Sequence, residues 1–191
     1  MQPYRIVIAD DESIIRLDLK KVLEDAGHTV AGEASDGQTA VNLARTLRPD
    51  VVILDIKMPV MDGLDAAKII CEENIAPVLL LTAYSEGELI DRAREAGVFA
   101  YLVKPFQEAD LKPAIEVAIA RHEQHQALQE QVTELEDRIE TRKAIERAKG
   151  ILIDRYGMKE ADAFRRIQTQ SMNTRKSMRE IAEAIIIAND V

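Results

Sequence analysis

Several features are scarce in this chain of 191 residues, and each scarcity excludes a class of protein. Cys71 is the only cysteine, so no internal disulfide can form, and its helical surroundings predict a reduced, partly buried thiol. No apolar run approaches the roughly 20 residues that a bilayer span requires. The first residues lead directly into a strand pattern and meet acids at Asp10, unlike a signal peptide. We therefore expect a cytoplasmic protein with no membrane partner.

The charge of the chain is unevenly distributed. The composition, 47% hydrophobic and 31% charged, is typical of a globular protein with a sizeable core, and the net charge is −9. Residues 1–140 carry 14 Lys and Arg against 27 Asp and Glu, whereas residues 141–191 carry 11 against 7. A basic tail on an acidic body indicates an anionic partner such as nucleic acid. An ordinary solvated surface is the alternative.

Strand and helix patterns alternate over the first 121 residues. Short apolar runs predict strands at 6–9, 28–34, 51–55, 78–81 and 100–103. Amphipathic patterns with glycine or turn signals predict helices at 13–26, 38–48, 64–73 and 86–96, and a fifth that begins near Gln107. Five such repeats predict an α/β fold: a doubly wound, five-stranded parallel sheet with helices on both faces, of the flavodoxin-like kind.

The fifth helix has no stop signal before Gly157. Four apolar residues recur on it at spacings of 4, 3 and 4, the seam of a coiled coil that would join a homodimer: Leu128, Val132, Leu135 and Ile139. Two heptads are few for a coiled coil, so an amphipathic helix packed within the monomer stays open. His122 and His125 lie three apart, but no third metal ligand is in view.

Residues 141–191 predict a small all-α domain of about three helices. Gly157 ends the long helix, an amphipathic pattern covers 160–172, and Ser177 is positioned to cap a third helix. Such a unit is too short to bury a large core alone, so we expect support from the coiled seam or a partner subunit. The predicted organisation is a domain at 1–121, a coiled-coil linker at 122–140 and a domain at 141–191.

Polar side chains stand at the carboxyl ends of four predicted strands. The first strand is followed by Asp10 and Asp11, the third ends on Asp55, the fourth is followed by Thr82 and the fifth by Lys104. Because open α/β sheets bind ligands beyond these strand ends, we expect the side chains to converge. Each residue alone has a plain alternative, as a helix cap or a surface charge. Their conjunction predicts a phosphoacceptor pocket.

The chemistry of these residue types supports that prediction. Three carboxylates in one place repel each other, and a Mg²⁺ ion held by them and by a backbone carbonyl near Lys57 relieves the repulsion. The Asp55 carboxylate is a competent nucleophile toward a phosphoryl donor. The Lys104 ammonium and the Thr82 hydroxyl can each bind a phosphoryl oxygen.

The full set resembles the receiver domain of two-component response regulators over residues 4 to about 121, through Asp10-Asp11, Asp55, Met58-Pro59, Asp62-Gly63, Thr82-Ala83 and Lys104-Pro105-Phe106. The resemblance implies that a sensor histidine kinase phosphorylates Asp55 and that Asp10 and Asp11 hold Mg²⁺. It also implies a cis Lys104–Pro105 bond. Tyr101 matches the aromatic residue that turns inward when Thr82 moves to the phosphoryl group; a packed edge-strand aromatic is the alternative.

The tail places cations beside small residues on one helix. Glycine inside a helix costs about 1 kcal/mol relative to alanine, so Gly150 indicates either close approach of an RNA backbone or tight helix packing. The tail resembles the ANTAR domain over about 135–190, through Ala148-Lys149-Gly150-Ile151-Leu152, Gly157, Ala163-Phe164 and Met172, with Ser171 in place of the usual alanine. The resemblance implies a dimeric antiterminator of the actinobacterial type that binds RNA stem-loops in nascent transcripts. The predicted RNA contacts are Arg142, Ala148, Lys149 and Gly150.

Two other function classes compete with this interpretation. A DNA-binding transcriptional regulator with a helix-turn-helix needs a tight turn before its recognition helix, and residues 173–176 form a longer polar connection. A phosphohydrolase would need a substrate pocket and a cap insertion, and the loops after the strands are short. We therefore expect no enzyme, beyond slow self-dephosphorylation.

Overall fold

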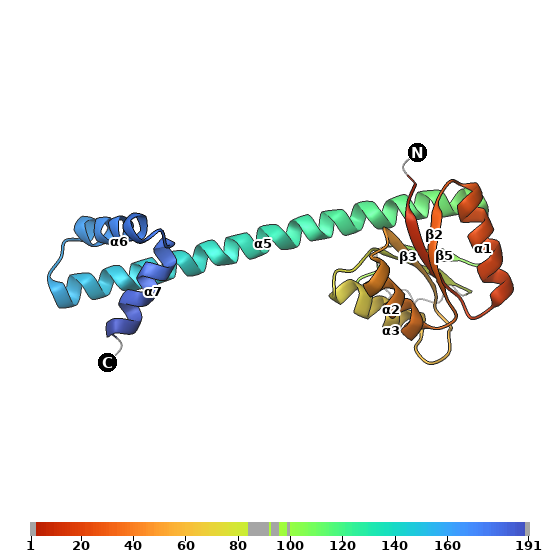
Figure 1. Cartoon of the computed structure of the whole chain (residues 1–191), viewed down its shortest axis with the longest axis horizontal. Coiled ribbons are helices and arrows are strands. Elements are labelled where there is room, and N and C mark those ends of the chain that lie inside the picture. The colour runs from red at the N-terminus through yellow and green to blue at the C-terminus, as the bar shows by residue number, and fades with distance from the viewer. Residues whose placement is uncertain (1–2, 84–91, 93–95, 99, 190–191) are drawn as a thin grey trace. The chain divides into compact units, whose positions relative to one another are not determined.

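The computed structural model describes residues 3–83, 92, 96–98 and 100–189. Two compact units make up the chain, Met1–Gln126 and Ala127–Val191. The first is an α/β unit and the second is entirely helical (Figure 1). Within the described part of the chain, no helix combines the length and the apolar character needed to cross a membrane.

A five-stranded parallel sheet in the order β2-β1-β3-β4-β5 forms the first unit. Its strands are β1 (Arg5–Ala9), β2 (Thr29–Ala34), β3 (Val51–Asp55), β4 (Val78–Thr82) and β5 (Ala100–Val103). The strands β3 and β4 are buried along their whole length, as a sheet covered on both faces requires. Asp55 at the end of β3 pairs with Leu81 of β4. The predicted doubly wound parallel fold is confirmed.

Helices cover both faces of the sheet. The helices α2 (Gly37–Leu47) and α3 (Gly63–Glu72) pack on one face, and α1 (Ser13–Asp25) and the first part of α5 (Glu108–Tyr156) on the other (Figure 1). Successive strand residues serve the two cores in turn: Val52 and Leu54 face α2 and α3, and Ile53 faces α1 and α5. The helix predicted over 86–96 lies almost entirely outside the described residues.

The ends of the helices follow local capping chemistry. The Asp36 carboxylate accepts a hydrogen bond from the Thr39 backbone N–H at 2.8 Å and so caps α2. Asp62 caps α3 in the same way, through the backbone N–H of Asp65 at 2.7 Å. Gly27 follows α1 with a φ of +86°, a conformation that favours glycine. These ends lie within one or two residues of the predicted ones.

The second unit contains α5 from Ala127 onward, together with α6 (Glu160–Thr174) and α7 (Met178–Asn189). Gly157 follows α5 with a φ of +64°. Ser177 and Glu180 form a reciprocal capping box at the start of α7: the Ser177 backbone N–H donates to Glu180 Oε2 at 2.8 Å, and the Glu180 N–H donates to Ser177 Oγ at 3.2 Å. The core is small and contains Ala148, Leu152, Ala163, Ile167, Ile181 and Ala182.

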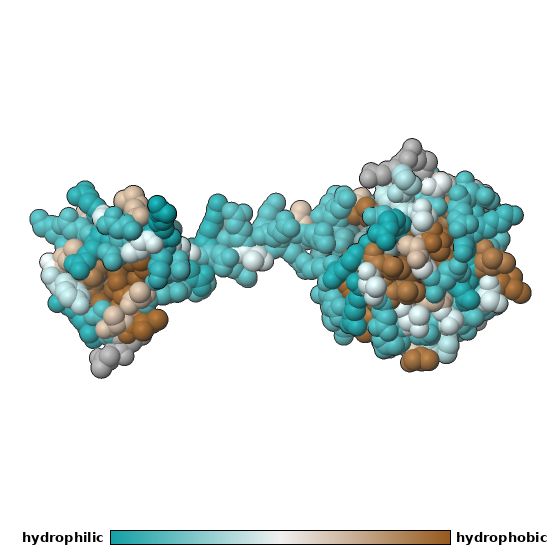
Figure 2. All heavy atoms as spheres, in the orientation of Figure 1, coloured by the Kyte–Doolittle hydropathy of each residue, from teal (hydrophilic) through white to brown (hydrophobic). Residues whose placement is uncertain are grey.

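The predicted coiled-coil seam is not covered by the described residues. Its four side chains remain about half exposed: Leu128 (60%), Val132 (53%), Leu135 (55%) and Ile139 (54%). Packing of this seam against the other helices of its own unit, one form of the alternative considered above, is therefore not what the structure shows. Further hydrophobic residues lie on the surface of each unit (Figure 2). His122 is buried, which lowers its pKa, and it belongs to no metal-binding group of the described residues.

Candidate functional site

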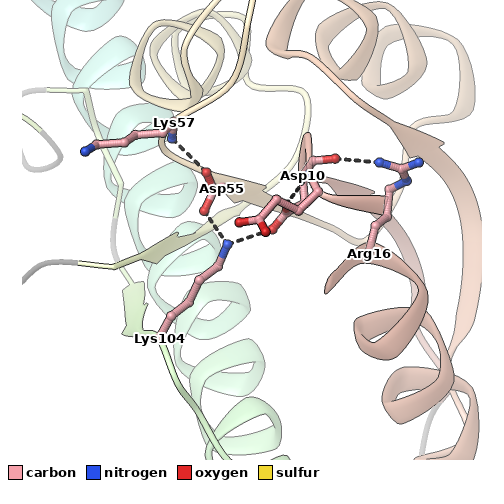
Figure 3. A network of polar contacts seen from close by, with 6 residues as sticks. Asp10, Arg16, Asp55, Lys57 and Lys104 are labelled. Carbon is pink, nitrogen blue, oxygen red and sulfur yellow. Dashed lines mark hydrogen bonds and ion pairs between the residues drawn. The ribbon is translucent and has the colours of Figure 1, made fainter. Parts of the chain in front are cut away.

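Three of the predicted pocket residues meet at the carboxyl edge of the sheet. The Lys104 ammonium donates hydrogen bonds to Asp10 Oδ2 at 2.7 Å and to Asp55 Oδ1 at 2.5 Å, and it lies between the two carboxylates (Figure 3). Asp10 is fully buried and Asp55 is 7% exposed. Strands β1, β3 and β5 thus bring Asp10, Asp55 and Lys104 together in one ion-paired cluster. In sequence, Asp10 is 94 residues and Asp55 is 49 residues from Lys104.

Backbone groups hold both carboxylates in place. The Lys57 N–H donates to Asp55 Oδ2 at 2.8 Å, and the Glu12 N–H donates to Asp10 Oδ1 at 2.9 Å. Arg16 of α1 reaches back and donates to the backbone carbonyl of Asp10 at 2.6 Å (Figure 3). Glu12, and not Asp10, is the N-cap residue of α1. The helix-cap alternative for Asp10 is therefore excluded.

Two carboxylates share one ammonium, so the cluster carries excess negative charge. Burial raises the pKa of Asp55, and the neighbouring Asp10 carboxylate raises it further, against the lowering effect of the Lys104 hydrogen bond. Burial alone would lower the pKa of Lys104, but its hydrogen bonds to Asp10 and Asp55 outweigh burial and the net change is upward. Lys104 therefore stays charged, and an additional cation near Asp55 would be favoured.

The glycine of the Asp62-Gly63 pair, in the loop after β3, lies against the backbone of Asp55. A Cβ atom at this position would lie 2.0 Å from the backbone oxygen of Asp55 and 3.0 Å from the Cα of Ile56. The Gly63 N–H also donates to the Ile56 carbonyl at 2.8 Å. The start of α3 thus rests directly on the backbone that carries Asp55, and no side chain fits between them.

The predicted switch residues lie on the two neighbouring strands. Thr82 is 6% exposed at the end of β4, and its carbonyl accepts a hydrogen bond from the Lys104 N–H at 2.6 Å. Tyr101 of β5 is 44% exposed, so it is not a fully packed edge-strand aromatic. The Lys104–Pro105 bond is cis, as predicted.

The predicted RNA contacts of the second unit differ from one another in accessibility. Arg142 is exposed, and Gly150 faces open space, since nothing lies within 4 Å of a Cβ placed there. Tight helix packing therefore does not explain Gly150 among the described residues of the second unit. Ala148 is fully buried in the core, so its predicted RNA contact is corrected: its side chain offers no surface to a ligand. Lys149 is only 7% exposed.

The Lys149 ammonium is engaged by two acids. It donates to Glu146 Oε2 at 3.0 Å and to Glu160 Oε1 at 2.8 Å, and these hydrogen bonds, the Glu160 bond foremost, raise the pKa of Lys149. Glu160 opens α6, so this lysine ties the start of α6 to α5. The RNA contact predicted for Lys149 would therefore compete with these two ion pairs.

Comparison with known families assigns both units. The family model of the response regulator receiver domain matches residues 6–116, and that of the ANTAR domain matches residues 133–186. The chain is a response regulator with a receiver domain and an ANTAR domain. It is 50% identical over 184 residues to the transcriptional regulatory protein PdtaR of Mycobacterium tuberculosis, covering 96% of this chain and 90% of that protein.

Two solved structures that match about 60% of this chain are signal receiver proteins. The signal receiver domain of the putative response regulator NarL from Mycobacterium tuberculosis matches with a TM-score of 0.57 and 28% identity, over 64% of this chain and 98% of that chain. A chain of the CheX-CheY-BeF3-Mg+2 complex from Borrelia burgdorferi matches with a TM-score of 0.56 and 27% identity, over 59% and 87%.

The receiver pocket has a donor set that suits Mg²⁺. Asp10 and Asp55 present hard carboxylate oxygens around an excess negative charge. Asp11, the third predicted ligand, is exposed, and among the residues that the structure describes no three His, Cys, Asp or Glu side chains are gathered as a metal-binding group. The Lys104 ammonium lies between the two buried carboxylates and neutralises part of their negative charge. From the sequence, this neutralisation was expected from the metal ion alone.

Sequence reasoning missed two supporting residues of the receiver pocket. Arg16 was not singled out, although a cation in the second turn of a helix that follows Asp10 and Asp11 is a usable signal. Gly63 was treated as a turn residue, because its close approach to Asp55 depends on how α3 returns to the sheet.

Proposed function

We propose that this response regulator is phosphorylated on Asp55 by a sensor histidine kinase and acts through its ANTAR domain as an RNA-binding transcription antiterminator. The observation that carries the proposal is the cluster of Asp55, Asp10 and Lys104 at the open edge of the sheet. An acceptor carboxylate, a second acid and a fixed ammonium are the groups that phosphoryl transfer to aspartate needs. The ANTAR match in the same chain supports the output.

In the proposed transfer, an Asp55 carboxylate oxygen attacks phosphorus, the phosphorus–nitrogen bond of the donor phosphohistidine breaks, and the leaving imidazole takes up a proton. Lys104 exchanges its hydrogen bond with Asp55 for one with a phosphoryl oxygen, and the Thr82 hydroxyl binds another. Asp10, Asp11 and Asp55, with the backbone carbonyl of Lys57, would hold Mg²⁺, which when bound neutralises the charge of the carboxylates and the phosphoryl group. The Mg²⁺ of the matching Borrelia burgdorferi complex supports this assignment.

The signal would leave the receiver domain through β5. Lys104 and Tyr101 lie on or next to this strand, so a new partner for Lys104 and an inward turn of Tyr101 alter the same surface. We propose that the change favours a homodimer through the exposed seam of Leu128, Val132, Leu135 and Ile139. A bias of a few kcal/mol suffices for such a shift. The proposed boundaries are a receiver domain at 1–121, a linker at 122–140 and an ANTAR domain at 141–191.

The ANTAR domain would bind stem-loops in nascent transcripts. Arg142 is an exposed cation with no ion-pair partner among the described residues, and Gly150 leaves the helix backbone open to a ligand. We propose these two residues as RNA contacts. The ion pairs of Lys149 favour a role in holding α6, with RNA contact only after they break. We propose no turnover of an external substrate, since the cluster supports phosphoryl uptake and slow loss only.

The test compares RNA binding and oligomeric state of the full chain with and without a small-molecule phosphoryl donor and Mg²⁺. Treated protein should bind stem-loop RNA more tightly and form more dimer, and Leu135→Lys should prevent both changes without reducing phosphoryl uptake. Duplex DNA serves as the competing ligand. Equal RNA affinity and equal oligomeric state in both conditions would exclude the switch, and preference for duplex DNA would exclude the antiterminator.

A further inference from the structure

An open cleft of about 520 Å³ lies within the ANTAR domain, between the middle of α5 and α6. Phe164 of α6 lines one side, and Ile145, Thr141 and Arg142 of α5 line the other. The cleft therefore offers an aromatic ring, an aliphatic side chain, a hydroxyl group and a guanidinium group to one ligand. The four residues lie within one compact unit, so the cleft does not depend on the receiver domain.

Acidic side chains also line this cleft, and each of them forms an ion pair with a cation. The pairs join each lining carboxylate to a cation: Glu134 with Arg138 at 3.1 Å, Asp137 with Arg179 at 3.5 Å, and Glu146 with Lys149 at 3.0 Å. Arg142 has no such partner among the described residues. Arg142 is therefore the lining cation that a phosphate group can meet without breaking an ion pair.

Phe164 is exposed without a structural reason inside the domain. Its side chain is 42% exposed and does not belong to the core of Ala148, Leu152, Ala163 and Ile167. A half-exposed ring beside an unpaired arginine matches the way proteins bind unpaired nucleotides: the base stacks on the ring, and the cation meets the phosphate. A volume of about 520 Å³ accommodates one nucleotide.

We propose that this cleft binds one unpaired base of an RNA loop, stacked on Phe164, with Arg142 on the adjacent phosphate. The inference rests on the proposed RNA-binding function and deepens it, because it names a base-stacking position that the small-residue motif around Gly150 does not contain. The Thr141 hydroxyl lies in the same cleft and can donate to or accept from the edge of the base. Stacking tolerates any base, so the hydroxyl would provide what sequence preference the cleft has.

The probe is a pool of RNA stem-loops with randomised loops, enriched on the full-length protein, with 2-aminopurine then placed at each loop position of the enriched RNA. Phe164→Leu removes the ring and keeps an apolar side chain, and Phe164→Tyr restores a ring. Tyr156→Leu is the matched control, since Tyr156 is 58% exposed and lies outside the cleft. Thermal unfolding by circular dichroism checks that every variant is folded.

Phe164→Leu should weaken RNA binding roughly 5- to 150-fold, the range for loss of one stacked base, and Phe164→Tyr should restore it. Tyr156→Leu should leave the affinity unchanged. One loop position should show 2-aminopurine quenching that Phe164→Leu abolishes. Arg142→Gln should reduce the salt dependence of binding by about one phosphate contact, a slope change of roughly 0.7.

A folded Phe164→Leu protein that binds the enriched RNA as tightly as wild type would overturn the inference while leaving the proposed function intact. The same holds if Tyr156→Leu, and not Phe164→Leu, abolishes the quenching. If wild-type protein enriches no RNA, the proposed function itself fails. Efficient competition by duplex DNA would also overturn the inference, because paired bases cannot stack on Phe164.

Discussion

The contact between Gly63 and the strand that carries Asp55 makes a sharp prediction. In Gly63→Ala the new Cβ would lie 2.0 Å from the Asp55 backbone oxygen, and contacts below 3.0 Å essentially never occur. The atoms must therefore separate by about 1 Å, and the atom in the way is strand backbone, which cannot rotate aside. Overpacking of this kind costs about 1–3 kcal/mol, and we expect a loss of unfolding free energy near 3 kcal/mol in the receiver domain.

The same displacement of the Asp55 backbone should also slow phosphoryl transfer to Asp55. A shift of about 1 Å in a reacting group can lower a rate about 100-fold, so phosphoryl uptake by Gly63→Ala should slow by up to that factor. Gly150→Ala is the matched control, because it is the same substitution where nothing lies within 4 Å of the new Cβ. There alanine should stabilise the ANTAR domain by about 0.5–1 kcal/mol through helix propensity.

Hydrogen exchange measured along a urea series reads the two domains separately, and a small-molecule phosphoryl donor measures the uptake rate. We expect changes of opposite sign for the two substitutions. The steric explanation is refuted if Gly63→Ala loses less than about 1 kcal/mol, the lower end of overpacking costs, or takes up phosphoryl groups at the wild-type rate.

Three further predictions address burial, protonation and the metal. Burial raises the pKa of Cys71 from 9.0 to about 12, which lowers the thiolate fraction at pH 8.5 roughly 1,000-fold, so alkylation by iodoacetamide should be slower than in urea-unfolded protein by about that factor; equal rates would contradict the burial. Burial, with the Lys112 charge, lowers the pKa of His28, so the unfolded state binds the proton more readily and receiver stability should fall as pH drops below about 6.5. His28→Phe should weaken that dependence in urea titrations from pH 7.5 to 5, and an unchanged slope would argue against it. Mg²⁺ should raise the melting temperature of wild type, and far less that of Asp10→Asn; equal shifts would place the ion elsewhere.

The residues of the receiver pocket could be predicted because their strands are unambiguous. Four apolar residues before Asp55 and before Lys104 fix where each strand ends, and parallel strands bring their carboxyl ends to one edge. The ion pairing of Lys104 with both acids could not be predicted, since three carboxylates of equal standing left open which two the ammonium would join. Asp11 has the same sequence context as Asp10 but lies outside the cluster.

The ANTAR domain shows the limit of helical periodicity. Ile139 and Ala148 are nine residues apart, about two and a half turns, so they face opposite sides of α5. Periodicity alone does not say which side meets α6 and α7, and the burial of Ala148 was therefore missed. The pairing of Lys149 with Glu160 crosses the turn at Gly157, and the direction of that turn is not written in the helix pattern.

Phosphorylation of Asp55 is the step on which the proposed function depends. Intact-protein mass spectrometry after incubation with a phosphoryl donor and Mg²⁺ tests it most directly. Wild type should gain one phosphoryl group, Asp55→Asn none, and Asp62→Asn, which keeps a good N-cap for α3, should gain one as wild type does. One phosphoryl group on Asp55→Asn, or none on wild type with its cognate kinase, would show that Asp55 is not the phosphoacceptor.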